Sequence, residues 1–173
     1  MTDEEQALVH EIEAAFEGVQ LEDGISLNMT EFYDSGGCAP EYAEKAKSDE
    51  REDWRQIPDE TLELFTVTFS FTDLKGFRFY LPAYMRWTAR NHRTSNAIIG
   101  SHTIYALSPR HDIFKTTSFA EWFTEQQRAV ILRFLRFAAE NSDTMDARIA
   151  SRRLRAFGEG GATNSARISP FQG

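Results

Sequence analysis

The chain has 173 residues, of which 41% are hydrophobic and 27% charged, a composition typical of one soluble globular domain. Its apolar runs are only a few residues long, far short of the roughly 20 that a membrane-spanning helix needs. The single cysteine, Cys38, excludes an intrachain disulfide, and the acidic first residues lack the order of a signal peptide. We therefore expect a cytoplasmic protein.

The net charge of −8 is unevenly distributed along the chain. Residues 1–63 carry 19 acidic and 4 basic side chains, whereas residues 64–173 carry 8 acidic and 15 basic ones. The simplest interpretation is that the two halves pack against each other and partly neutralise. The alternative is an acidic face whose field attracts a basic partner or repels nucleic acid.

The first third of the chain predicts short helices joined by turns. Thr2 and Glu5 have capping-box spacing, and the apolar residues that follow recur at helical spacing, which predicts a helix over residues 3–16. Asp34 to Gly37 read as a turn. Pro40 suits the first position of a helix over residues 41–53, and Pro58 the start of a short helical turn.

The middle of the chain predicts a β-hairpin over about residues 65–81. Large apolar residues alternate with Thr and Ser from Phe65 to Thr72, a turn follows around Gly76, and the alternation resumes from Phe77 to Leu81. Pro82 would end the second strand and begin a helix to about His92. The sequence pattern does not distinguish a strand from a helix over residues 62–72, nor over residues 97–107.

The last third predicts two long helices. Capping-box spacing occurs at Ser118 with Glu121 and at Thr124 with Gln127, and helical spacing follows over residues 125–140. A final helix is predicted over residues 144–157, and the Gly- and Ser-rich residues 158–173 are predicted to form a disordered tail. The fold class is thus α+β: one mostly helical domain over residues 1–157, with a small antiparallel hairpin covered by flanking helices.

Several stretches together resemble a bacterial family of uncharacterised proteins, a domain of unknown function. The matching stretches are residues 12–16, 53–58, 76–85, 124–130 and 134–135. The specific one is the block Gly-Phe-Arg-Phe-Tyr-Leu-Pro-Ala-Tyr-Met at residues 76–85. The resemblance covers most of residues 8–157. It implies a more helical segment before this block than the alternation predicts, and it transfers no catalytic residues.

The run from Lys75 to Trp87 is the densest aromatic and cationic stretch of the chain. On a strand, Arg78 and Tyr80 would lie on the face opposite the apolar residues, and Arg and Tyr are favoured anchors of protein interfaces. The candidate binding residues are Arg78, Tyr80, Tyr84, Arg86 and Trp54. The structural alternative is that Arg78 pairs with the acidic half while the tyrosines pack at the edge of the core.

The other patterns do not match a recognisable catalytic, metal-binding or nucleic-acid-binding motif. Lys75-Gly76-Phe77 begins like an RNA-binding signature, but Arg78, Tyr80 and Pro82 depart from it. The four histidines are far apart and Cys38 has no neighbouring base, so we predict no metal site, cofactor or nucleophile. The arginines of the last helix could contact nucleic acid, although four of them spread around more than one face; they are Arg148, Arg152, Arg153 and Arg155.

These observations favour a non-enzymatic module that binds another protein, in the manner of an immunity or inhibitor protein. The expected partner is a protein of unknown identity rather than a membrane or a nucleic acid. The alternative is an enzyme of unrecognised type with a site beside Tyr80 and Tyr84, which would require a pocket containing a titratable group with a shifted pKa.

Overall fold

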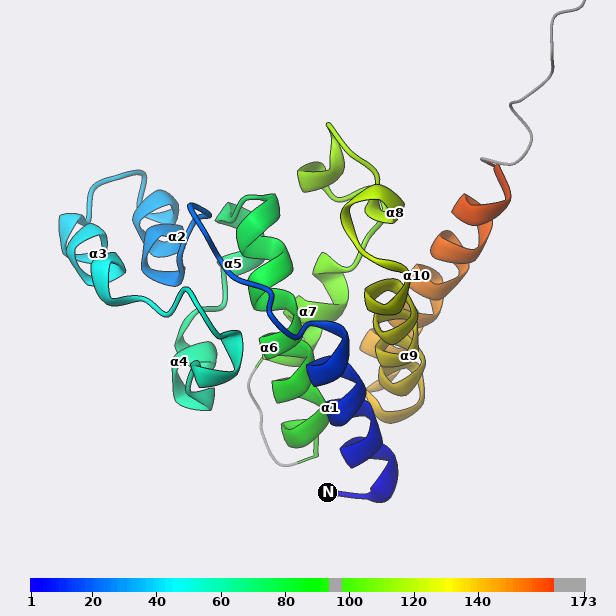
Figure 1. The fold of residues 1–173 in the computed structure, drawn as a ribbon. Helices are drawn as coiled ribbons and strands as arrows, with labels where there is room; N and C mark the ends of the chain where they lie inside the picture. Colours follow the sequence, from blue (N-terminus) through cyan, green and yellow to red (C-terminus); the bar gives the residue numbers. More distant parts are fainter. Residues whose placement is uncertain (94–97, 164–173) are drawn as a thin grey trace, which may run out of the picture.

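The computed structural model describes residues 1–93 and 98–163, and every regular element in these ranges is helical (Figure 1). The long helices are α1 (Asp3–Ala15), α6 (Leu74–Asn91), α9 (Glu125–Asn141) and α10 (Thr144–Thr163). The shorter ones are α2 (Leu27–Asp34), α3 (Pro40–Lys45), α4 (Asp59–Leu64), α5 (Thr68–Phe71), α7 (Ile99–Ala106) and α8 (Phe119–Trp122). Three 3-10 helices join them: η1 (Ala46–Ser48), η2 (Trp54–Gln56) and η3 (Asp112–Phe114).

The predicted β-hairpin over residues 65–81 is wrong, and with it the α+β fold class. Thr68–Phe71 forms the short helix α5, and Leu74–Asn91 forms the single helix α6, with Pro82 inside it rather than at its start. A lone strand in the first segment would have left its backbone N–H and C=O groups without a partner strand, which is costly in a buried position.

The pattern of α6 misled the prediction because this helix is buried on nearly all sides. Its buried residues run almost without a break from Gly76 to Ala89. A helix enclosed by others carries apolar residues at most positions, so a short alternation such as that from Phe77 to Leu81 can appear within it by chance. The interior proline removes one helical hydrogen bond, a cost of about 3 kcal/mol that the burial of so many side chains can offset.

The N-terminus of α6 is fixed by Asp73 and Gly76. The Asp73 carboxylate accepts hydrogen bonds from the backbone N–H of Gly76 at 2.8 Å and of Ile25 at 3.1 Å. A Cβ on Gly76 would lie 2.7 Å from the carbonyl oxygen of Ile25, so only glycine permits this close approach. The loop before α2 is thereby joined to the central helix.

The predicted helix starts at both ends of the chain are confirmed. Thr2, Ser118 and Thr124 each form a capping box with the residue three positions later, at the starts of α1, α8 and α9. The helix predicted over residues 41–53 is shorter, because α3 ends at Lys45 and η1 at Ser48. Helix α10 continues to Thr163, and the rest of the predicted tail over residues 158–173 lies outside the described residues.

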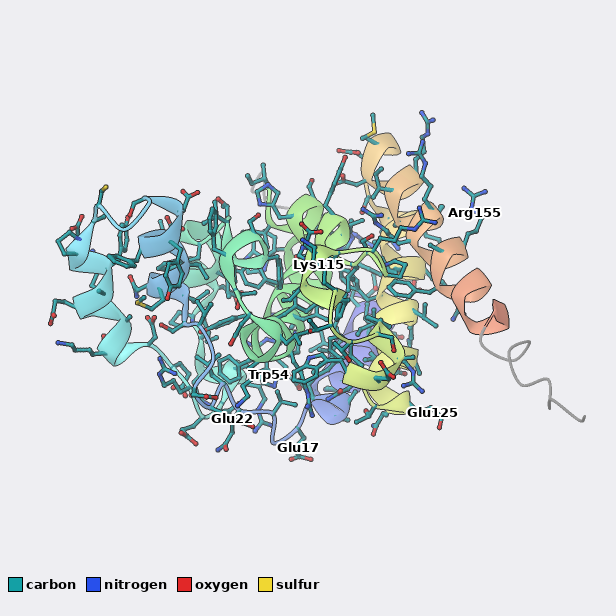
Figure 2. The ribbon with its side chains drawn as sticks, turned by 90° about the horizontal axis from the view of Figure 1, so that it is seen from above. Glu17, Glu22, Trp54, Lys115, Glu125 and Arg155 are labelled. Carbon is teal, nitrogen blue, oxygen red and sulfur yellow. The ribbon has the colours of Figure 1, made fainter. Side chains whose placement is uncertain are left out.

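Helix α6 is the centre of the molecule. Helices α1 and α7 pack on it, α9 packs on α1, and α10 packs on α9 and α7. Helices α2, α3 and α4 form a lobe on the other side of α6, so that α3 and α10 lie at opposite ends of the molecule (Figures 1 and 2). In the described part of the chain, no helix is long and apolar enough to cross a membrane.

Candidate functional site

A pocket of about 590 Å³ lies in the lobe, between α2, the α3–η1 segment and α4, with Tyr80 of α6 at its base. Its volume falls within the range of ligand-binding pockets. Three carboxylates line it, those of Glu31, Asp49 and Glu50, together with the single cation Lys45. We call this site the acidic pocket.

Backbone amides hold two of these carboxylates in place. Asp49 accepts a hydrogen bond from the backbone N–H of Asn28 at 2.9 Å, and so satisfies an amide in the first turn of α2 that Ser26 leaves uncapped. Glu50 accepts hydrogen bonds from the N–H groups of Glu52 at 2.8 Å and Asp53 at 3.0 Å. These hydrogen bonds lower the pKa of Glu50, so its carboxylate is charged at neutral pH.

Glu31 is held differently. Its side chain is half-buried on α2, and burial, reinforced by the nearby Asp34, raises the pKa of its carboxyl group. Within the described residues, none of Glu31, Asp49 and Glu50 forms an ion pair. A cation entering the pocket would therefore meet carboxylates that no arginine or lysine in the described part of the chain already pairs with.

The remainder of the pocket is largely apolar. Leu27, Ile57 and Phe65 contribute to its walls, and Leu64 at its edge is 77% exposed, the largest exposed fraction among the described bulky apolar side chains. The backbone N–H of Leu27 donates to the Tyr80 hydroxyl at 3.2 Å. Burial raises the pKa of Tyr80 above the usual value for a tyrosine, so its phenol stays protonated at neutral pH.

The structure does not bring the five predicted binding residues together on one surface. Trp54 and Arg86 form a buried pair that does not line the acidic pocket, with the Arg86 guanidinium 5.1 Å from the centroid of the Trp54 ring. Trp54 donates its indole N–H to the carbonyl of Phe16 at 3.0 Å, and Arg86 lies 3.7 Å from the Glu13 carboxylate. Both residues join segments of the core.

Arg78, Tyr80 and Tyr84 are also distributed among different surroundings. Arg78 is half-buried, with its guanidinium 5.9 Å from the centroid of a ring of Trp122. Tyr84 is buried, and its hydroxyl lies 2.8 Å from that of Thr68. Of the five residues, only Tyr80 lines the acidic pocket, although its side chain is 0% exposed. Contact of these residues with a partner stays a prediction.

The sequence did not identify the carboxylates of the acidic pocket as a site, because they come from separate segments of the chain. Glu31 lies on α2, whereas Asp49 and Glu50 follow η1, and no motif spacing relates them. Residues 1–63 are so rich in acidic side chains that abundance alone singled out none of them. The only signal was the excess of acidic residues in this half of the chain.

A smaller pocket of about 230 Å³ between α5 and α7 brings together His102 and His111. The Nδ1 atom of His102 lies 2.6 Å from the carbonyl oxygen of Thr66, and Nδ1 of His111 accepts from the N–H of Ile113 at 3.2 Å. Burial lowers the pKa of His111, which is neutral at pH 7. Both rings therefore tie turns to the core, and no group of three potential metal ligands occurs among the described residues.

Comparison with known proteins identifies a family but no function. The model of a family described as "Family of unknown function (DUF6714)" matches residues 4–158, which confirms the resemblance drawn from the sequence. No curated protein and no solved structure matches the chain.

Proposed function

The chain belongs to the family of unknown function DUF6714, and we propose from its geometry that it is a non-enzymatic module that binds another protein. Its acidic pocket would receive a basic, amphipathic segment of that partner. The observation that carries the proposal is the set of three pocket carboxylates without an ion pair among the described residues, two of them held by backbone amides. An immunity- or inhibitor-like role fits such a module.

The lining of the pocket supports a basic side chain with an apolar stem. Arginine and lysine bury their methylene groups against apolar surface while their charged ends reach polar partners. Leu27, Ile57 and Phe65 would contact the stem, and Asp49 and Glu50 would accept hydrogen bonds from the charged end. Because these carboxylates are already fixed, little side-chain entropy is lost when a guanidinium binds.

The test is a titration with a labelled nine-residue peptide of alternating leucine and arginine, followed by fluorescence anisotropy. We expect saturable binding that weakens at least about tenfold in the double variant Asp49→Asn/Glu50→Gln, here called the pocket variant. Each charge-assisted hydrogen bond lost contributes about 1.5 kcal/mol, and about 1.4 kcal/mol corresponds to a tenfold change in affinity.

A matched double variant controls for net charge. Glu125→Gln/Glu140→Gln removes the same two charges from exposed positions on α9, far from the lobe, and should leave binding unchanged (Figure 2). A peptide of alternating leucine and glutamate should not bind. Equal weakening in both double variants would show only diffuse attraction to an acidic protein, and would overturn the proposal.

One observation favours a second candidate function, an enzyme that uses the same pocket. A carboxyl group with a raised pKa in a pocket is typical of a general acid, and Glu31, which lines the pocket together with the protonated Tyr80, has this character. A screen for small molecules that are converted by the wild-type protein, but not by Glu31→Gln, tests this alternative. Peptide binding without any turnover would favour the binding module.

A further inference from the structure

Helix α10 carries a row of arginines whose side chains are exposed rather than packed in the core. Arg148, Arg152 and Arg155 are all exposed, and together with Ser151 they line a shallow depression of about 390 Å³. None of the three forms an ion pair or a side-chain hydrogen bond within the described residues. Arg153 points inward instead and donates to the hydroxyl of Ser108 at 3.0 Å. We call the three exposed residues and Ser151 the arginine face.

The centre of the molecule shows how this chain neutralises charge where it can. Arg93 lies 3.0 Å from the Glu5 carboxylate, Arg86 pairs with Glu13, and Arg133 with Glu11. All three pairs join the acidic and basic halves of the sequence. The arginine face takes no part in this pairing, because α10 lies at one end of the molecule and the acidic lobe at the other (Figures 1 and 2).

We propose that the chain associates with itself head to tail, with the arginine face of one copy docked in the acidic pocket of a second copy. This inference rests on the proposed function and names the partner that supplies the basic segment. A single copy cannot bring the two surfaces together, whereas a second copy presents to each surface the charge that it lacks.

The dimensions of the two surfaces match. Arg148 and Arg155 are two helical turns apart, which corresponds to about 10 Å along the axis. Three guanidinium groups over that length face three carboxylates in a pocket of about 590 Å³. The apolar walls of the pocket suit the arginine stems, and guanidinium and carboxylate groups form paired hydrogen bonds of good geometry.

The head-to-tail arrangement decides the form of the assembly. A head-to-tail contact leaves one free pocket and one free arginine face on every open assembly, so association continues into short filaments or until a ring closes, rather than stopping at an open dimer. Because the contact is electrostatic and partly exposed, association should weaken as salt is added.

The test is sedimentation equilibrium of the full chain at about 50 mM and about 500 mM salt. We expect an average mass above the 19.8 kDa of one chain at low salt, which falls to that value at high salt. The pocket variant and the double variant Arg152→Glu/Arg155→Glu, each alone, should remain monomeric. Mixed together, they should form a one-to-one dimer, because each retains the surface that the other has lost.

Controls separate this inference from the proposed function. Arg110→Glu/Arg136→Glu changes the same charge at exposed positions outside α10 and should still associate. A wild-type protein that stays monomeric at low salt, or variants that fail to complement, would overturn self-association, while peptide binding by the acidic pocket would still support the proposed function. The double variant Arg152→Glu/Arg155→Glu could still associate but no longer bind a single-stranded oligonucleotide that the wild type binds. That result would instead assign the arginine face to nucleic acid and overturn the inference.

Discussion

In the centre of the molecule carboxylates pair with arginines, whereas in the acidic pocket amide groups hold two of the three carboxylates. Glu5, Glu11 and Glu13 of α1 each meet an arginine from α6, α9 or the segment after α6. Asp49 and Glu50 are equally well positioned but have no such partner among the described residues. Charge in the centre therefore stabilises the fold, whereas the pocket carboxylates are the groups to which we assign binding in the proposed function.

The largest effect should come from the centre, at Trp54. Trp54→Ala removes a buried ring, its hydrogen bond to Phe16 and the surface against which Arg86 packs. We expect a loss of about 4 kcal/mol in the free energy of unfolding, measured by urea denaturation. Leu64→Ala, at the exposed edge of the acidic pocket, should leave stability within about 0.5 kcal/mol but weaken peptide binding. A stable Trp54→Ala protein would show that Trp54 does not serve the fold.

Arg86 should follow, because it is the most buried arginine of the central pairs. Arg86→Ala removes the contact with Trp54 and a hydrogen bond to the Arg55 carbonyl at 3.2 Å, at a cost of about 2 kcal/mol. Arg90→Ala is the control, since Arg90 is exposed and lies 3.8 Å from Asp59, a pair expected to contribute less than about 0.5 kcal/mol. Equal losses in the two variants would contradict the central role of Arg86.

Asp73 connects the two regions, and its loss should have an intermediate effect. Asp73→Ala leaves the N–H groups of Gly76 and Ile25 without their acceptor, so we expect a loss of about 1.5 kcal/mol. Asp73→Asn retains an acceptor oxygen and should recover most of it. Amide hydrogen exchange shows which part of the chain is destabilised. We expect faster exchange only in the first turn of α6 and in residues 24–27. Faster exchange throughout the protein would contradict a local role of Asp73 in joining these two segments.

The smallest effects should have opposite signs at Glu5 and Glu31. The hydrogen bond from the Thr2 N–H, with Arg93 and His92, lowers the pKa of Glu5, so its stabilisation is present at neutral pH and lost as pH falls through that pKa. Burial raises the pKa of Glu31, so its charged form destabilises the fold as pH rises through the raised value.

Stability curves against pH check this contrast. Glu5→Gln should be less stable than the wild type at neutral pH and equal to it in acid. Glu31→Gln should be slightly more stable at neutral pH, by less than about 0.5 kcal/mol, and equal to the wild type at about pH 3. A loss of stability at neutral pH in Glu31→Gln would place this carboxylate among the groups that hold the fold together.

The sequence by itself determined the elements whose signals are local. Capping boxes at Thr2, Ser118 and Thr124 and the apolar stripes of α1 and α9 act within a few residues, so spacing alone was sufficient to predict them. Tertiary structure decided the rest. Neighbours bury most positions of helix α6, so its apolar residues also allowed an alternating interpretation that packing alone rules out. The acidic pocket exists only because packing brings residues from α2 and from the segment after η1 to one surface.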